Sequence, residues 1–438
     1  MKSGTNHLRI LSLFLCLLCL MPCPVLAAST EITEPTPSGV DAVYVMNLEY
    51  GQAVYAKNET QHLYPASTAK LVTALVAERA FSGNLDKSIE ITREMKDAFR
   101  GRCLGFVVGE RVTVEALLHA MLVGGYNDAA IALAMATSGS LADFCKEMNA
   151  LATALGADET YYTNPTGLHD ANMVTTARDT AYIAAAIVKN ETLFAITKRQ
   201  KYVMPATNKS GEWTIYSRNS LISSILEEDY YYAYAEGIHA GSTDEGGDCV
   251  VTSGQLDGLS YVCVVLGGKQ DTEKNNAFLT AASTLRYTLK SFSVQTLKSQ
   301  KAEITTLPVQ YSATVTEVAV HPRADMTALL RNDFDPKTDV TFETVLDTEG
   351  MDAPFESGTV VGRLYARDKN GRLLAQTELV VTEDVEAHGF LLFMAKVKGF
   401  VMSPLFLIVV LLIAALILGS VFLDKQRRHR RRVRRPRR

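Results

Sequence analysis

The pattern of apolar and polar positions divides the chain into a central part that mixes strand and helix patterns, a later part of short alternating segments, and an apolar run at each end. In the central part, a β-hairpin is predicted by two apolar runs around an Asn- and Gly-containing turn, in AVYVMNLEYGQAVYAKN. A second hairpin is predicted by VVTSGQLDGLSYVCVVLGG. Helical periodicity is found over 67–82, 113–137, 140–154, 177–189 and 272–290. We therefore expect a sheet with helices packed against it, of the α/β (α+β) class, over residues 40–292.

The pattern of hydrophobic and polar positions changes at about Thr305, where short segments of alternating hydrophobicity are separated by turns. Examples are YSATVTEVAV, VTFETVL, TVVGRLYAR and LLAQTELVV. Such a pattern predicts a small all-β domain, which we expect over residues 303–384. Because this part offers no cluster of catalytic side chains, we interpret it as a spacer or interaction domain.

The N-terminal run has the features of a secretory signal peptide. A basic start, a short apolar core and small residues at the exit predict a signal peptide over 1–28, with cleavage after Ala27 or Ala28. Cys23 suggests a lipoprotein anchor as an alternative, but Met-Pro before it are not the small residues that such a site needs. A Pro- and Thr-rich linker is expected over 29–39.

The C-terminal run predicts a membrane anchor. Pro404 to Leu423 is free of charged residues and rich in Leu, Ile and Val, and we expect a transmembrane helix over 401–423. At about 1.5 Å of rise per residue, such a helix spans a hydrocarbon core of ~30 Å. Residues 424–438 contain ten Lys or Arg, which predicts a cytoplasmic tail and contact with anionic lipid headgroups. A nucleic-acid interpretation of the Arg run is the alternative, which the adjacent anchor disfavours. The folded part is therefore expected outside the plasma membrane.

The charge of the expected ectodomain differs from that of the whole chain. The chain has 44 Lys and Arg against 48 Asp and Glu. Twelve of the cations and one acid, Asp424, lie in the signal peptide and the tail. The segment between these two ends therefore has 32 cations and 47 acids, a net charge near −15. This acidity argues against nucleic acid or an anionic polymer as the main ligand of the ectodomain.

Four cysteines remain after the expected cleavage, namely Cys103, Cys145, Cys249 and Cys263. Their spacings fit no metal-binding motif, so no metal site is expected. If the second hairpin pairs symmetrically around SGQLDG, Cys249 lies opposite Cys263, and the compartment permits a disulfide. Two buried free thiols are the alternative and the more usual case.

The sharpest catalytic candidate is the stretch PASTAK, in which Ser67 and Lys70 lie three positions apart. On a helix these positions share a face, so that the hydroxyl and the amine can meet. Serine is a weak nucleophile until a base takes its proton, and a lysine held away from water can be that base. Because about one or two S-x-x-K matches are expected by chance in a chain of this length, the motif alone also fits a capping serine and an exposed lysine.

Four stretches give the motif a context: LYPASTAKLVTALVA, LGFVVGERVTVEALLHAMLVGGYNDAAIALA, TNPTGLHDANMVTTARDTAYIA and GIHAGSTDEGGDCVV. Together they resemble the serine D-alanyl-D-alanine carboxypeptidases, the low-molecular-mass penicillin-binding proteins. The resemblance covers nearly the whole ectodomain, and the segment 305–382 resembles the second domain of the family. It implies a β-lactamase/transpeptidase-like catalytic domain that works without a metal or other cofactor.

The chemistry of the family is that of the motifs S-x-x-K, S-x-N and K-T-G together. The resemblance implies that Ser67 is the acylated nucleophile and Lys70 its base. The substrate would be the D-Ala-D-Ala end of a peptidoglycan stem peptide, the product would be free D-Ala, and penicillins would acylate the same serine. Such an enzyme acts in cell-wall biogenesis and cell shape.

Two of the three motifs depart from the family pattern. The second reads Gly125-Tyr126-Asn127, so that the asparagine is kept and Gly125 stands at the position of the proton-relay serine. The third reads His239-Ala240-Gly241, so that an imidazole replaces the fixed charge of the lysine. Gly241 still allows a substrate backbone to approach. If His239 binds the substrate carboxylate as a cation, activity should rise towards pH 6.

Three functions therefore stay open at this point. The first is a divergent but active D-Ala-D-Ala carboxypeptidase, in which Tyr126, His119 or His239 substitutes for the missing groups. The second is a non-catalytic wall-binding or scaffold protein that keeps the fold, and the third is acyl transfer on another amide or ester. His169, Asp170 and Asp179 are interpreted as structural loop and cap residues.

Overall fold

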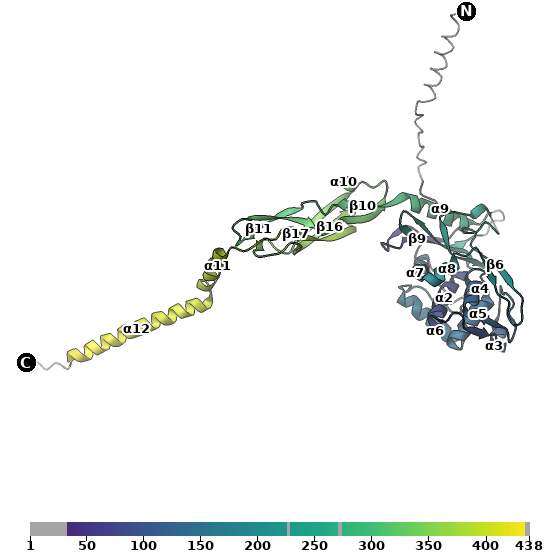
Figure 1. Cartoon of the computed structure of the whole chain (residues 1–438), viewed down its shortest axis with the longest axis horizontal. Coiled ribbons are helices and arrows are strands. Elements are labelled where there is room, and N and C mark those ends of the chain that lie inside the picture. The colour runs from purple at the N-terminus through teal and green to yellow at the C-terminus, as the bar shows by residue number, and fades with distance from the viewer. Residues whose placement is uncertain (1–32, 226–227, 270–273, 434–438) are drawn as a thin grey trace, which may run out of the picture. The chain divides into compact units, whose positions relative to one another are not determined.

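The computed structural model describes residues 33–225, 228–269 and 274–433. The chain divides into two compact units, with the boundary between Ser291 and Phe292 (Figure 1). The expected signal peptide over 1–28 and the first residues of the linker lie outside the described residues.

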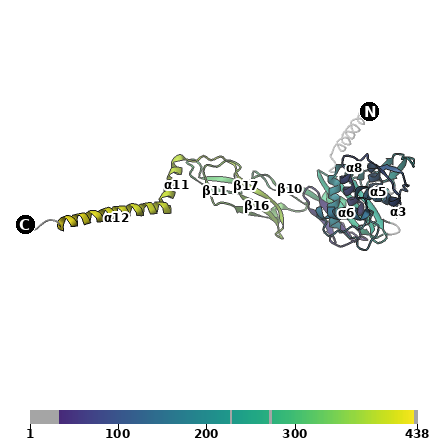
Figure 2. The same cartoon turned by 90° about the horizontal axis from the view of Figure 1, so that it is seen from below.

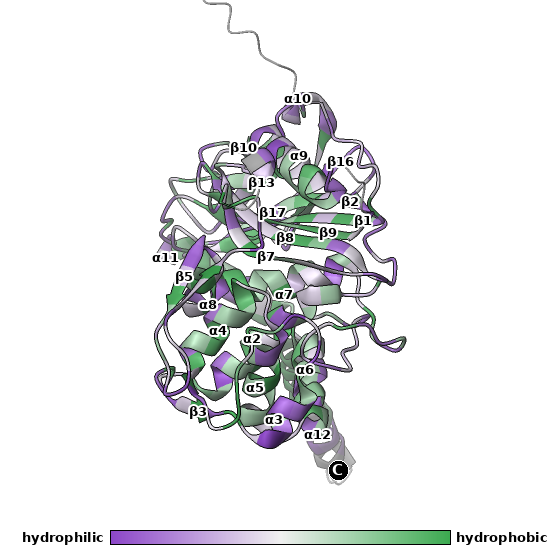
Figure 3. Cartoon of the chain, turned by 90° about the vertical axis from the view of Figure 1, so that its right-hand side faces the viewer, coloured by the Kyte–Doolittle hydropathy of each residue, from purple (hydrophilic) through white to green (hydrophobic). Residues whose placement is uncertain are grey.

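The first unit is built on a five-stranded sheet of order β2-β1-β9-β8-β7, in which all neighbours are antiparallel. Its strands are β1 (Ala42–Asn47), β2 (Ala53–Lys57), β7 (Ala235–Thr243), β8 (Gly247–Leu256) and β9 (Leu259–Gly268). Both predicted hairpins are confirmed, and the pairing of β1 with β9 joins them into one sheet. Both β1 and β9 consist mainly of hydrophobic residues (Figure 3). At the other end of the order, β7 is an edge strand.

Helices cover both faces of this sheet (Figure 3). The helices of the unit are α2 (Ala69–Ala80), α3 (Arg93–Ala98), α4 (Val114–Leu122), α5 (Asn127–Ser138), α6 (Leu141–Ala154), α7 (Ala177–Lys189), α8 (Glu191–Thr197) and α9 (Asn276–Ser291). On one face α9 packs against β8 and β9, and on the other α7 packs against β1 and β9. The central helix α2 contacts α5, α6 and α7 and is almost entirely buried. The unit also has two small antiparallel sheets of two strands each, β3 (Ser88–Glu90) with β4 (Arg111–Thr113) and β5 (Lys201–Met204) with β6 (Trp213–Tyr216).

The single helix expected over 113–137 is wrong, because the segment forms two helices, α4 and α5. The break lies at the Gly-Gly pair that follows Val123. Gly125 has a φ of 71°, a left-handed conformation that ends a helix and that glycine adopts without strain. Hydrophobic periodicity continues across the break, which is why the pattern predicts one helix.

The possible disulfide between Cys249 and Cys263 does not form. All four cysteines of the described part are free. The β8–β9 turn is shorter than the symmetric pairing assumed: Leu256 pairs with Leu259, and both Asp257 and Gly258 have positive φ, as in the tight primed turns of hairpins. This register places Cys263 opposite Thr252, and both buried thiols stay free.

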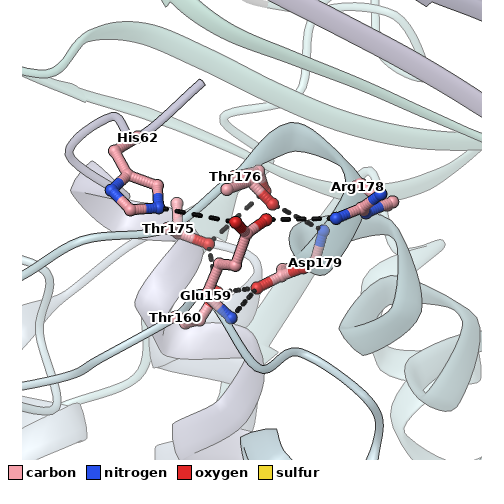
Figure 4. A network of polar contacts seen from close by, with 7 residues as sticks. All are labelled: His62, Glu159, Thr160, Thr175, Thr176, Arg178 and Asp179. Atoms are coloured by element: carbon pink, nitrogen blue, oxygen red, sulfur yellow. Dashed lines mark hydrogen bonds and ion pairs between the residues drawn. The ribbon is translucent and has the colours of Figure 1, made fainter. Parts of the chain in front are cut away.

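The loops at the start of α7 are held by a polar network (Figure 4). The carboxylate of Asp179 accepts hydrogen bonds from the Glu159 backbone N–H at 2.9 Å and from the Thr160 hydroxyl at 2.8 Å. Thr176 caps α7 by accepting a hydrogen bond from the Asp179 backbone N–H. Exposed His62 and Arg178 contact the Glu159 carboxylate. These contacts support the structural interpretation of Asp179.

His169 and Asp170 also have structural contacts. His169 packs edge-on against Tyr64, with ring centroids 4.6 Å apart. Asp170 accepts a hydrogen bond from the backbone N–H of Asn172 at 2.8 Å, which closes its turn. Neither side chain is among those that line the cavity beside Ser67.

The second unit has a core of its own, formed by β-strands (Figure 2). A six-stranded sheet has the order β14-β16-β17-β12-β11-β15, and β10 pairs with β13. The strands are β10 (Phe292–Lys298), β11 (Thr305–Gln310), β12 (Glu317–Pro322), β13 (Met326–Arg331), β14 (Val340–Leu346), β15 (Met351–Asp352), β16 (Val360–Asp368) and β17 (Leu373–Val381). The all-β prediction is confirmed, and because β10 pairs with β13 this unit begins at Phe292, ahead of the expected start at residue 303.

Two helices follow the strands of the second unit, α11 (Gly389–Val401) and α12 (Pro404–Val433). Within the described residues, one helical segment, Pro404–His429, is long and apolar enough to cross a membrane. The chain leaves the helical path at Met402 and Ser403, so this segment begins three residues after the expected start at 401.

Candidate active site

Ser67 lies on a short 3-10 helix, Ala66–Thr68, that leads directly into α2. The Thr68 hydroxyl donates a hydrogen bond to the Pro65 carbonyl at 2.7 Å and fixes this turn. Ala66 has a φ of 45°, which is rare for a residue with a side chain. The loop residue Gly167 lies against it so closely that a Cβ there would overlap the Ala66 carbonyl oxygen. The nucleophile candidate is thus presented by a strained and tightly packed turn.

Lys70 lies one turn along the same helical segment and reaches back to Ser67. Its Nζ donates hydrogen bonds to Ser67 Oγ at 3.2 Å and to the Thr166 carbonyl at 2.7 Å. The side chain is buried, at 1% exposure. Burial, together with the nearby Arg102 guanidinium, lowers the pKa of Lys70 to about 7. Near neutral pH a large fraction of Lys70 is therefore uncharged and able to accept the proton of Ser67.

Asn127 is the first residue of α5 and follows the break after α4. Its Nδ2 donates a hydrogen bond to the Arg100 carbonyl at 3.0 Å, and its backbone N–H donates to the Arg102 carbonyl at 2.7 Å. These bonds fix the asparagine amide in the wall of the cavity beside Ser67. At Gly125, the space where a side chain would lie is open, with Arg218 Cγ at 3.8 Å as the nearest atom. The left-handed backbone there disfavours a serine.

His239 lies on β7, but its side chain points into the protein. Its Nδ1 is hydrogen bonded to the Leu122 carbonyl at 2.9 Å, and Nε2 has no hydrogen-bond partner among the described residues. Burial, with the positive charges of Lys70 and Arg218 nearby, lowers the pKa of His239 to about 4. The imidazole is uncharged at pH 6, so this geometry gives no support to carboxylate binding by a protonated His239. Of the expected substitutes, His119 is buried and stacked on Tyr202, outside the cavity.

A cavity of about 180 Å³ lies beside Ser67. Asn127 and Gly241 line it, as the sequence predicts, and a Cβ at Gly241 would come within 2.7 Å of Ser67 Oγ. Two arginines, Arg102 and Arg218, also line it. A neighbouring cavity of about 210 Å³ shares Arg218 and Gly241 with the first.

The sequence pattern indicates neither arginine. Arg218 lies in the loop after β6, where its backbone N–H donates to the Val123 carbonyl at 3.1 Å and ties the loop to the α4–α5 break. Arg102 lies in the loop after α3. Both occur in irregular segments without a recognisable motif, so only the fold brings them to Ser67. Thr166 acts through its backbone carbonyl, which no side-chain pattern reveals.

Comparison with protein families matches the first part of the chain, residues 30–270, to the D-alanyl-D-alanine carboxypeptidase family. Residues 292–387 match the C-terminal domain of penicillin-binding protein 5. Among curated relatives, D-alanyl-D-alanine carboxypeptidase DacF of Bacillus subtilis is 25% identical over 374 residues, 85% of this chain and 91% of the relative. D-alanyl-D-alanine carboxypeptidase DacC of Escherichia coli is 27% identical over 388 residues, 86% of this chain and 91% of the relative.

The solved structures give the same result for the fold. Penicillin-binding protein 5 of Haemophilus influenzae superposes with a TM-score of 0.61 at 23% identity, covering 81% of this chain and 99% of that protein. A peptidoglycan synthesis regulatory factor, PBP3, of Streptococcus pneumoniae gives a TM-score of 0.59 at 25% identity, covering 80% of this chain and all of that protein. The motif segments, the two-domain fold and these matches agree, and the chain belongs to the low-molecular-mass serine D-alanyl-D-alanine carboxypeptidases.

Proposed function

We propose that this protein removes the terminal D-Ala from peptidoglycan stem peptides through an acyl-enzyme on Ser67, and that it does so with altered second and third motifs. The observation that carries the proposal is the hydrogen bond of 3.2 Å from Lys70 to Ser67 Oγ, made by a buried amine whose pKa is lowered to about 7. General-base activation needs a nucleophile within hydrogen-bond reach of a base whose pKa lies near the working pH, and this pair has both features.

In the acylation step, neutral Lys70 accepts the Ser67 proton as Oγ attacks the carbonyl carbon of the penultimate D-Ala. The C–N bond then breaks, and the leaving amine of the terminal D-Ala takes a proton from the Lys70 ammonium. In the second step, water attacks the ester with Lys70 again as the base, which releases the shortened peptide and returns the proton to Ser67. No step requires the hydroxyl that is missing at Gly125, because Lys70 contacts Ser67 directly.

The substrate backbone is proposed to lie along β7. This strand is at the edge of its sheet, so one side of it is open to an added extended peptide. Gly241 lies next to Ser67 and has no side chain to block that approach. Ala240 and Ser242 line the same cavity.

Arg218 is proposed to bind the carboxylate of the terminal D-Ala. It lines the cavity with Ser67, and a guanidinium stays charged at every working pH, whereas buried His239 does not. Arg218→Gln should lower kcat/KM for a D-Ala-D-Ala peptide about 10- to 100-fold, the loss expected for one charged hydrogen bond. Steady-state D-Ala release measures this. Arg93→Gln, on exposed α3, is the matched control, and equal kcat/KM values for the two variants would argue against this role for Arg218.

The direct test of the function is release of D-Ala. The purified full chain, incubated with a pentapeptide that ends in D-Ala-D-Ala, should yield the tetrapeptide and one equivalent of D-Ala, quantified by mass spectrometry. Treatment with penicillin should add the mass of one penicillin per chain. If neither product nor adduct forms, the carboxypeptidase proposal fails.

The second candidate function is that of a catalytically impaired wall-binding or scaffold protein. Two features motivate it: Gly125 lacks the relay hydroxyl, and the His239 imidazole is buried and uncharged. This candidate predicts saturable binding of the pentapeptide, measured by calorimetry, with no acyl-enzyme. A covalent penicillin adduct on Ser67 would count against it.

The segment Pro404–His429 is proposed to anchor the protein in the plasma membrane, with the basic tail in the cytoplasm and the folded units outside. An apolar helix of this length and a flanking run of Arg favour this topology. The full chain should remain in the membrane fraction after an alkaline wash, and protease added to intact spheroplasts should remove the penicillin-labelled domain. Recovery in the wash would contradict the anchor, and protection from protease would contradict the topology.

A further inference from the structure

Arg102 is held at the cavity by two contacts with the altered second motif. Its Nε donates a hydrogen bond to the Gly124 carbonyl at 3.0 Å. Its guanidinium lies over the ring of Tyr126, 4.8 Å from the centroid. A guanidinium over an aromatic face is favourable, and the hydrogen bond fixes its direction. The segment Gly124–Tyr126, which contains the position of the missing relay serine, therefore serves here as a support for an arginine.

A second arginine, Arg218, lines the same cavity and also lies beside this segment. Arg218 Cγ lies 3.8 Å from the place where a Cβ of Gly125 would be. Arg102 and Arg218 thus approach the cavity next to consecutive residues, Gly124 and Gly125. No carboxylate lines this cavity, and within the described residues neither arginine forms an ion pair.

The charges around the cavity are consequently unbalanced. Lys70, whose pKa is lowered to about 7 by burial and by Arg102, is only partly charged near pH 7, and His239 is neutral. A carboxylate that lines the adjacent cavity, that of Asp248, accepts a hydrogen bond from Asn275 at 3.0 Å, and that of Asp128 accepts hydrogen bonds from the Gly105 and Ala129 backbone N–H groups. Two permanent cations at one site without an acid are complementary to an anion.

We propose that Arg102, supported by Gly124 and Tyr126, acts with Arg218 as a two-arginine clamp on the C-terminal carboxylate of the substrate and supplies the fixed charge that the third motif lacks. This inference rests on the proposed carboxypeptidase function and adds a specificity-determining residue to it. A guanidinium is a permanent cation in proteins, so Arg102 can bind a carboxylate where the neutral imidazole of His239 does not. It transfers no proton and leaves acid–base chemistry to Lys70.

The test compares two substrates that differ only at the clamped group: a peptide that ends in D-Ala-D-Ala and the same peptide ending in D-Ala-D-alaninamide. The ratio of their kcat/KM values, from release of D-Ala or D-alaninamide by the full chain, measures carboxylate recognition. We expect Arg102→Gln to reduce this ratio about tenfold or more, through the loss of a charged hydrogen bond. Arg102→Lys, which keeps the charge and loses the planar fork, should keep part of the ratio.

Further variants separate the clamp from a structural effect. Tyr126→Phe, which keeps the ring, should retain the ratio, whereas Tyr126→Ala should lower it. Arg111→Gln, at an exposed arginine that pairs with Glu90, is the matched control. Melting temperature and the rate of penicillin acylation show whether each variant is folded.

An unchanged acid-to-amide ratio in Arg102→Gln would overturn the clamp while D-Ala release still supports the carboxypeptidase function. Absence of D-Ala release in the unmodified protein would instead defeat the function on which the clamp rests. If Arg102→Gln slows both substrates equally, Arg102 acts only on structure or on Lys70, and the clamp is wrong.

Discussion

Ser67→Ala is expected to abolish both penicillin labelling and D-Ala release. The variant lacks the only atom on which the proposed acyl-enzyme forms, and removal of a nucleophile from a catalytic set costs on the order of 10⁴ to 10⁶ in rate. Ser67 is partly exposed on the 3-10 helix before α2, and its hydroxyl accepts a side-chain hydrogen bond from Lys70, so the fold should tolerate its loss. Intact-mass spectrometry after penicillin treatment and a coupled D-Ala assay are the two measurements.

A matched control for this variant is Ser138→Ala. Ser138 ends α5 and donates a hydrogen bond to Glu147 at 2.6 Å, outside the cavity. This control should retain the adduct and the full rate. A penicillin adduct that persists in Ser67→Ala would show that another residue is acylated and would remove Ser67 from the mechanism.

Lys70→Arg is expected to reduce penicillin acylation of Ser67 by a factor on the order of 10² to 10⁴, the usual contribution of a general base. Arginine keeps a positive charge and hydrogen-bond donors but does not lose its proton in proteins, so it cannot accept the proton of Ser67. The comparison with Lys70→Gln, which is neutral, separates the charge from the base. If the general base, rather than the positive charge, is required, penicillin should acylate both variants slowly.

The pH dependence follows from the lowered pKa of Lys70. Below about pH 7 the amine is largely protonated and unable to act as a base, and above it the neutral form predominates. The acylation rate of the unmodified protein should therefore rise with pH and reach a plateau above about pH 8. Stopped-flow measurement with a chromogenic cephalosporin from pH 5.5 to 9 tests this. A flat profile, or a rate that falls across this range, would exclude Lys70 as the titrating base.

The direction of this profile is opposite to the one expected for a protonated His239. A cationic histidine would make activity rise as the pH drops towards 6. The structure places the imidazole in the interior, where its pKa falls to about 4, and leaves the positive charge of the cavity to Arg102 and Arg218. One pH series thus decides between the two assignments.

Local patterns in the sequence determined most of the secondary structure and the pairing of the two main catalytic candidates. The spacing of Ser67 and Lys70 predicts one helical segment with both side chains on the same side, and the structure places their polar atoms 3.2 Å apart. Apolar runs on either side of a turn predict the two hairpins, and period-two alternation predicts the all-β unit. Such signals are read within a few residues of chain, because helix and strand periodicities depend on near neighbours.

Other features were decided by the tertiary structure alone. His239 is neutral because β7 turns its side chain into the interior, and burial is a property of the packed fold. Cys249 and Cys263 form no disulfide because the two-residue turn between β8 and β9 sets a register in which Cys263 lies opposite Thr252. Arg102 and Arg218 meet at one cavity although more than a hundred residues separate them in the sequence. Positions in irregular loops carry no periodicity, so only the folded chain shows which of them share a site.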